Sequence, residues 1–210
     1  MLFRNRIDAG QQLAVRLASV GLTDPVVLGL PRGGIPVAWV VAKRLGAPLD
    51  VFVARKIGAP GHQELGIGAV AEGSDEIVIT ASARGLGLDE SSIQQLAAQT
   101  RADVEHRVQA YRGGRALPSL AARDVVVVDD GLATGVTAEA ALKALRRHQP
   151  RQLVLAIPVG APETIDRLAR EADRVVCVHT PDTFYAVGEW YDDFQQTTDA
   201  EVERVLPPRL

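Results

Sequence analysis

The sequence predicts an α/β protein whose central sheet is doubly wound and mainly parallel. Several short, β-branched apolar runs are nearly continuous rather than alternating, which is typical of strands covered on both faces of a parallel sheet. Helical patterns lie between them, and a strand, a tight turn and a helix that repeat in this order indicate βαβ units. The expected strands cover residues 26–30, 51–54, 125–128, 153–158 and 175–178.

The helices are expected from apolar spacing and from residues that favour helix ends. They cover residues 10–20, 35–45, 137–148 and 162–172. The second begins near Pro36 and ends before Gly46, because helices favour proline early and glycine just past the end. Residues 77–79 are a weaker strand candidate for a sheet edge. A chain of 210 residues without repeats or low-complexity linkers fits a single domain over residues 1–210.

Residues 89–113 are expected to form a helical insertion in this domain. The segment is rich in good helix formers, and its apolar positions recur every three or four residues, as on an amphipathic surface helix. A possible basic stripe in and just after it consists of Arg101, Arg107, Arg112 and Arg115. Because Asp103 and Glu105 interrupt the stripe and aromatic residues are scarce, we interpret it as a solvated face and expect no nucleic-acid partner.

The composition excludes several other classes of protein. A net charge of −3 provides no global basic field that would draw the chain to nucleic acid or membrane. The single Cys177 cannot form an internal disulfide, which fits a reducing compartment, and its apolar neighbours favour a buried residue over a catalytic thiol. No signal peptide pattern and no run of about 18 apolar residues is present. We therefore expect a cytoplasmic protein without a membrane partner.

The stretch V-V-V-V-D-D-G-L-A-T-G-V-T over residues 125–137 carries the chemistry. The valines predict a buried strand that ends at Asp129 and Asp130, and ligands of open α/β sheets bind outside the carboxyl ends of strands. Gly135 lets the backbone approach a ligand, and free N–H groups at a helix start bind phosphate. Carboxylates accept hydrogen bonds from sugar hydroxyls and help hold a divalent cation. The stretch therefore predicts a site for a sugar phosphate.

A nucleotide-binding loop of a different type does not fit this stretch. It contains neither G-x-x-x-x-G-K-[ST] nor G-x-G-x-x-G, so the P-loop and dinucleotide-binding fingerprints are missing. The plain structural alternative is a Gly-Thr turn that caps a helix, with Asp130 merely solvated. The position of the acid pair directly before Thr-Gly-x-Thr disfavours that alternative.

The same stretch resembles the phosphoribosyl-diphosphate signature of type I phosphoribosyltransferases. The resemblance implies that Asp129 and Asp130 are catalytic, hold the ribose hydroxyls, and bind Mg²⁺ directly or through water. It also implies that the 5-phosphate is wrapped by Ala133, Thr134, Gly135, Val136 and Thr137. The likeness extends from about residue 4 to residue 205 and is greatest to bacterial phosphoribosyltransferase-domain proteins whose acceptor is often unassigned.

The turn after the first strand, Pro31-Arg32-Gly33-Gly34, suits a polyanion. Exposed N–H groups beside the glycines form an anion nest, and Arg32 supplies positive charge. The alternative is a tight turn with a surface arginine. In the family that the chain resembles, the equivalent turn cradles the diphosphate and can contain a non-proline cis peptide. By position, that bond would join Pro31 to Arg32.

Residues 56–68 are expected to be a flexible loop. Glycines and a proline that follow Arg55 and Lys56 have the composition of a lid. The segment resembles the catalytic loop that closes over the diphosphate, which makes Arg55 and Lys56 candidate catalytic residues. His62 and Glu64 are candidates for proton transfer, although a histidine in a surface loop usually has no such role.

Residues 180–195 hold five of the nine aromatic residues (2 Trp, 3 Tyr and 4 Phe). This clustering predicts either a stacking surface for a flat ligand or a satellite hydrophobic cluster under a loop. The segment resembles the base-binding hood of purine-salvage phosphoribosyltransferases. The resemblance implies that Phe184 and Tyr185 stack on a base and that Asp192 or Asp193 accepts a hydrogen bond from a base amine.

Together the motifs imply transfer of a 5-phosphoribosyl group from phosphoribosyl diphosphate to a purine-like base, as in nucleotide salvage. Arg32, Arg55 and Lys56, with Mg²⁺, would stabilise the leaving diphosphate. The alternative is a regulatory protein of the same fold that senses phosphoribosyl diphosphate or a nucleotide. The cations and glycines of residues 55–68 favour the enzyme. A homodimer is the default assembly for such domains.

Overall fold

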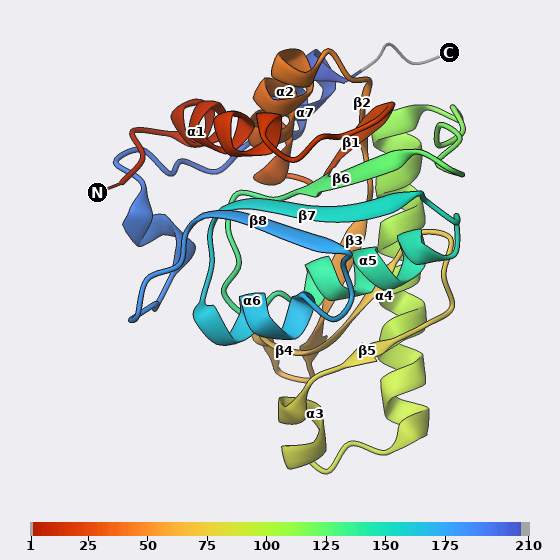
Figure 1. The fold of residues 1–210 in the computed structure, drawn as a ribbon. Helices are drawn as coiled ribbons and strands as arrows, with labels where there is room; N and C mark the ends of the chain where they lie inside the picture. Colours follow the sequence, from red (N-terminus) through yellow and green to blue (C-terminus); the bar gives the residue numbers. More distant parts are fainter. Residues whose placement is uncertain (1, 207–210) are drawn as a thin grey trace.

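In the computed structural model, residues 2–206 are described, apart from the side chains of residues 63, 64, 82 and 84, and they form two sheets (Figure 1). The central sheet has five strands in the order β2-β1-β6-β7-β8, and every neighbouring pair is parallel. The strands are β1 (Pro25–Gly29), β2 (Leu49–Val51), β6 (Asp124–Val128), β7 (Gln152–Val159) and β8 (Arg174–His179). The predicted parallel sheet is confirmed.

Helices cover both faces of the central sheet, as Figure 1 shows. The valines of β6 explain why its apolar run is continuous: Val126 and Val128 belong to the core under α1 and α2, whereas Val125 and Val127 belong to the core under α5. Burial on both faces leaves no solvent side for polar residues. The helices are α1 (Arg6–Ala18), α2 (Gly34–Leu45), α5 (Val136–Arg146) and α6 (Pro162–Leu168).

The helix ends follow from local capping. Helix α1 begins before the predicted residue 10, because the side chain of Asn5 accepts a hydrogen bond from the Asp8 N–H (3.0 Å) and caps the helix. Helix α2 ends at Gly46, which has a left-handed backbone (φ 62°), as its sequence predicted. Within the described residues, no helix combines the length and the hydropathy that crossing a membrane requires.

The segment expected as a flexible loop, residues 56–68, is instead part of an antiparallel hairpin. Its strands β3 (Ala54–Ala59) and β4 (His62–Ala71) pair with β5 (Val78–Ile79) in a three-stranded sheet. The glycines serve close packing: a Cβ on Gly66 would lie 2.7 Å from the Lys56 Cδ, and one on Gly68 would lie 2.4 Å from the Val78 carbonyl oxygen. At Gly68 the neighbouring atom belongs to the backbone, so glycine there reflects close packing within a strand, which composition alone does not distinguish from a loop.

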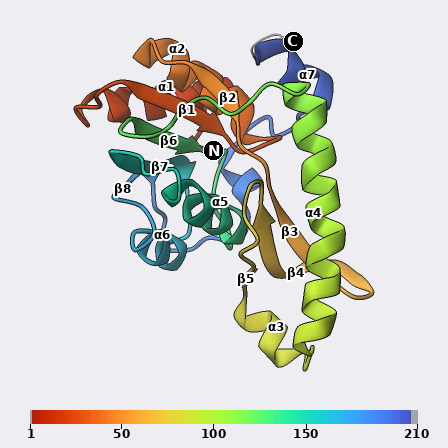
Figure 2. The ribbon, with the colours of Figure 1, turned by 90° about the vertical axis from the view of Figure 1, so that its right-hand side faces the viewer.

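Helix α4 (Glu90–Arg112) covers the segment that was expected to be a helical insertion, and it runs beside β3 and β4 (Figure 2). A short α3 (Ala81–Gly85) precedes it. The expectation of a solvated basic stripe is wrong for Arg112, which is buried and paired with Glu72. Arg115 pairs with the buried Asp50. Burial raises the pKa of Glu72 even though Arg112 opposes the shift.

The N-terminal segment packs against the hood beside the central sheet. Phe3 and Tyr191 form an isolated parallel bridge, and their rings lie 5.2 Å apart between centroids. Tyr191 follows a short 3₁₀ helix, η1 (Val187–Trp190), within the expected hood. The last helix, α7 (Asp199–Val205), begins with a capping box formed by Thr198 and Glu201 and lies against α2. The N-terminal segment and the hood therefore form one small packed unit.

Candidate functional site

The strand order places a crevice between the ends of β1 and β6. These strands are parallel neighbours, but α2 and α5, which follow them, cover opposite faces of the sheet. Ligands of doubly wound sheets bind at such a switch point. The turn over residues 31–34 and the loop over residues 129–137 therefore flank the same crevice, as the sequence implied.

The turn after β1 packs directly onto the acid pair. Its Pro31–Arg32 peptide bond is cis, as the family resemblance implied. A Cβ on Gly33 would lie 2.0 Å from the Asp130 Oδ2, which means that only glycine fits. The Gly34 N–H donates to the Leu30 carbonyl (3.0 Å), so this amide is used within the turn. Of the amides predicted to bind an anion in this turn, those of Arg32 and Gly33 therefore remain.

The two aspartates have different surroundings. The Asp130 Oδ2 accepts a hydrogen bond from the Arg6 Nε (2.8 Å), and the Asp130 carbonyl accepts one from the Tyr191 hydroxyl (2.6 Å). The Asp129 Oδ1 accepts from the Asp130 N–H (2.9 Å). Burial raises the pKa of Asp129 well above its usual range, and the neighbouring Asp130 charge adds to the shift. Burial also raises the pKa of Asp130, against the opposing charge of Arg6.

The loop after the acid pair keeps its amides free and its carbonyls occupied. Among the described residues, no hydrogen bond uses the N–H of Ala133, Thr134 or Gly135 as donor. The carbonyl oxygens of the same residues are all occupied. The Ala133 carbonyl accepts a hydrogen bond from Thr164 Oγ1 (2.6 Å), and the Thr134 carbonyl accepts one from Arg167. The Gly135 carbonyl accepts one from the Glu139 N–H (2.9 Å). With Val136 and Thr137 at the start of α5, the loop presents free donors of the kind that bind phosphate.

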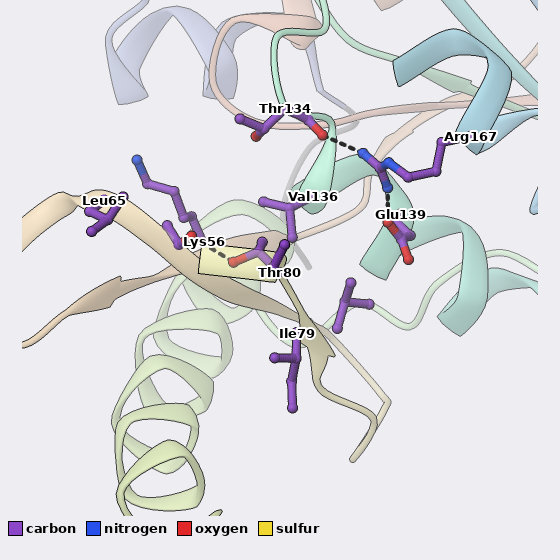
Figure 3. A pocket seen from close by; sticks show the side chains of 11 residues that line it. Lys56, Leu65, Ile79, Thr80, Thr134, Val136, Glu139 and Arg167 are labelled. Atoms are coloured by element: carbon purple, nitrogen blue, oxygen red, sulfur yellow. Dashed lines mark hydrogen bonds and ion pairs between the residues drawn. The ribbon is translucent and has the colours of Figure 1, made fainter. Parts of the chain in front are cut away.

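A pocket of about 370 Å³ joins the sequence-predicted segments. It is lined by the turn after β1, by strand β3 of the hairpin and by the loop over residues 129–137, called the phosphate loop from here on. The lining residues are Leu30, Pro31, Ala54, Arg55, Lys56, Gly58, Asp129 and Thr137. The structure thus brings the candidate cations Arg55 and Lys56 into the lining of the same pocket as Asp129. A neighbouring pocket of about 490 Å³, shown in Figure 3, lies between the hairpin and the loop and shares Lys56. His62 is exposed at the hairpin tip, and the side chain of Glu64 lies outside the described residues.

The hood is largely a packed aromatic cluster. Phe184 stacks on Trp190, with ring centroids 6.4 Å apart and planes 15° from parallel. Tyr185 is 79% exposed, and Asp192 is exposed while its backbone N–H donates to the Phe3 carbonyl (2.9 Å). Part of the hood is therefore a hydrophobic cluster, whereas stacking of a base on the exposed Tyr185 stays a prediction.

The donor set suits Mg²⁺. This ion keeps several waters and is usually held by one or two carboxylates together with substrate oxygens. Asp129 offers such a carboxylate at the pocket wall, beside Asp130. In the described part of the chain, no group of three or more His, Cys, Asp or Glu side chains could hold a metal by itself. Any ion here would therefore share its ligands with a bound phosphate compound.

Sequence reasoning missed three residues at this site: Arg6, Thr164 and Arg167. Arg6 lies 124 positions from Asp130 and has no local motif that reveals its role. Thr164 and Arg167 are three positions apart, which places them on one side of α6. A threonine and an arginine with this spacing, just after the strand beside β6, are a weak signal that could have indicated contact with the loop.

The fold and these loops define a doubly wound α/β protein with a candidate phosphate site at the switch point of its sheet. A finer class follows from comparison with known proteins: residues 4–195 match the family model described as "Phosphoribosyl transferase domain". The chain belongs to this family, which confirms the resemblance found in its sequence.

Individual relatives agree with this assignment. The chain is 46% identical over 205 residues to "Putative phosphoribosyl transferase Rv0571c" of Mycobacterium tuberculosis, a match over 98% of this chain and 46% of that protein. It therefore spans about half the length of the curated relatives that it matches. The crystal structure of TT1426 from Thermus thermophilus is 47% identical and covers 98% of both chains at a TM-score of 0.82. AQ2163 from Aquifex aeolicus shares the fold at 14% identity and a TM-score of 0.50, over 82% of this chain and 71% of that chain.

Proposed function

We propose that this chain transfers a 5-phosphoribosyl group from phosphoribosyl diphosphate to a nitrogenous acceptor and releases diphosphate. The observation that carries the proposal is the phosphate loop, whose free amides at Ala133, Thr134 and Gly135 closely follow a half-buried acid pair. A ligand that spans both must carry hydroxyls at one end and a phosphate at the other. Phosphoribosyl diphosphate has this form, and its diphosphate would extend toward Arg55 and Lys56.

The reaction breaks the bond between the anomeric carbon and the diphosphate oxygen and forms a bond from that carbon to the acceptor nitrogen. The diphosphate leaves with the electron pair, and the acceptor loses its proton. Positive charge develops on the ribose ring and negative charge on the leaving group. Catalysis is therefore a matter of positioning and of electrostatic stabilisation by fixed groups.

Each loop has a task in this scheme. Arg32, Arg55 and Lys56 stabilise the negative charge of the leaving diphosphate. Asp129 and Asp130 accept hydrogen bonds from the ribose hydroxyls and stabilise the positive ring. Asp129 and Asp130 would hold Mg²⁺, and the ion would supply positive charge that stabilises the leaving group.

For the acceptor, we propose a purine-like base. Tyr185 offers an exposed ring for stacking, and Asp192 is an exposed hydrogen-bond acceptor in the same hood. In this scheme Phe184 supports the hood through its stacking on Trp190 and contacts the base at its edge. Tyr185→Ala should then raise the KM for the base and leave the KM for phosphoribosyl diphosphate unchanged.

The test is a screen for diphosphate release. The protein is incubated with phosphoribosyl diphosphate, Mg²⁺ and each of a set of purine and pyrimidine bases, with the Asp129→Asn variant as control. We expect release with at least one purine and none from the variant. Tight binding of phosphoribosyl diphosphate by calorimetry without release for any base would instead identify a regulatory sensor of the same fold.

We further propose that the protein works as a cytoplasmic homodimer. Helix α4 extends along one side of the molecule with much of its surface exposed, which makes it the first candidate for subunit contacts (Figure 2). Size-exclusion chromatography with light scattering would measure the mass directly. A mass close to 22.4 kDa at micromolar concentration would rule out the dimer.

A further inference from the structure

Two side chains of helix α6 form hydrogen bonds with the carbonyls of the phosphate loop. The Thr164 hydroxyl donates to the Ala133 carbonyl (2.6 Å), and the Arg167 guanidinium donates to the Thr134 carbonyl. Figure 3 shows Arg167 reaching both Thr134 and Glu139 of α5. Two successive carbonyls are thus directed toward α6. In a peptide unit the N–H and C=O point in opposite directions, so this fixes where the neighbouring amides point.

The anchors differ in their surroundings. The Thr164 side chain is buried, so its hydroxyl has no water to replace a lost partner. Arg167 is 42% exposed, and its bond to the loop is therefore weaker in free energy. The Arg167 guanidinium also pairs with Glu139 and so joins α6 to α5. Thr164 is the principal anchor, and Arg167 supports it.

We propose that Thr164 and Arg167 are positioning residues that hold the phosphate loop with its amides directed at the 5-phosphate of the substrate. This inference rests on the proposed function, because it assumes that the loop binds that phosphate. It assigns no chemical step to either residue. Their effect is on how tightly a 5-phosphate is bound.

Packing alone is the competing explanation, because the methyl group of Thr164 also fills space. A Cβ on Gly135 would lie 2.5 Å from the Thr164 Cγ2, so the methyl closely backs the loop. Two substitutions separate the roles. Thr164→Val keeps the volume and removes the hydroxyl, whereas Thr164→Ser keeps the hydroxyl and removes the methyl.

The experiment is calorimetric binding of ribose 5-phosphate and, separately, of inorganic diphosphate with Mg²⁺. We expect Thr164→Val to weaken ribose 5-phosphate binding about five- to tenfold, as the loss of one buried hydrogen bond implies. Thr164→Ser should bind near the wild-type level. Arg167→Met should lose about two- to fivefold, since its bond is partly exposed. Diphosphate binding should not change in any variant.

Arg170→Met is the matched control, because Arg170 lies exposed just after α6. It should bind both ligands as the wild type does. Unchanged ribose 5-phosphate affinity in Thr164→Val would overturn the inference, as would an equal loss for both ligands. If the wild type binds no ribose 5-phosphate, the proposed function itself fails. In turnover, the KM for phosphoribosyl diphosphate should rise in Thr164→Val with little change in kcat, as for the loss of uniform binding.

Discussion

The absence of a side chain at Gly33 determines how closely two parts of the candidate site pack. Its missing side chain lets the turn after β1 touch the carboxylate of Asp130, where any Cβ would overlap the Oδ2 atom. The sequence pointed to this glycine because a cation and two glycines at a strand end suit a polyanion. It could not show that the glycine faces the acid pair, since that contact depends on the pairing of β1 with β6.

Gly33→Ala should therefore lower the affinity for phosphoribosyl diphosphate by at least about tenfold and destabilise the fold by about 1–3 kcal/mol, as overpacking does. Calorimetry and urea unfolding measure the two effects. Gly85→Ala is the control, because a Cβ there meets nothing within 4 Å. Wild-type binding by Gly33→Ala would show that the turn can move away without consequence.

Substitutions of Asp129 and Asp130 test whether these carboxylates are needed for turnover but not for folding. Asp129→Asn keeps the shape of a side chain at the pocket wall and removes its charge, so turnover should fall to about 1% or less, as for the loss of one electrostatic group in an active site. Asp130→Asn should also abolish turnover, and it breaks the ion pair with Arg6. Circular dichroism should show an intact fold in both. Retained activity would remove these carboxylates from the mechanism.

Among the elements, the strands of the central sheet were the most predictable. Valines buried on both faces give β6 a continuous apolar run, a pattern that strongly favours a central parallel strand. The hairpin of β3 and β4 was not predictable in the same way. Its glycines look like loop residues, and the close backbone contact that requires Gly68 appears only once the neighbouring strand is in place.

Helix α4 is tied to the rest of the domain by a buried ion pair that the sequence presented as a surface charge. Arg112→Met would leave Glu72 buried without its partner, and should destabilise the protein by about 3–5 kcal/mol in urea unfolding. Arg147→Met, which breaks the more exposed pair with Glu76, should cost less than about 1 kcal/mol. Equal effects of the two substitutions would contradict the burial of the Arg112 pair.

On the scale of the whole molecule, the site depends on contacts between segments far apart in sequence. The switch point could be predicted from the order of strands and helices, because a doubly wound sheet must reverse somewhere. The role of Arg6 could not, since nothing near it in sequence resembles a site. Its contacts with Asp130 and with the Gln195 carbonyl (2.7 Å) become visible only when residues 130 and 195 are in place beside the N-terminal segment.

The packing of the N-terminal segment against the hood can be tested at Phe3, which is fully buried against Tyr191. Phe3→Ala should destabilise the protein by about 3–5 kcal/mol, the usual cost of removing a buried phenylalanine. It should also weaken phosphoribosyl-diphosphate binding, because Tyr191 supports the Asp130 backbone. Leu2→Ala, at a residue that is 39% exposed, should change neither thermal unfolding nor calorimetric affinity by much. Wild-type affinity in Phe3→Ala would show that packing against the hood does not affect ligand binding at the site.

The bond from Arg6 to Gln195 spans 189 positions, and this separation orders events during synthesis. A nascent chain can build the sheet and display the acid pair while the ribosome is still adding the segment that will secure Arg6, since chain regions made first can fold first. Contacts between such distant positions form slowly because closing a long loop costs entropy. Arg6 therefore gains its contact with Gln195 only after residue 195 has been synthesised, long after the acid pair itself.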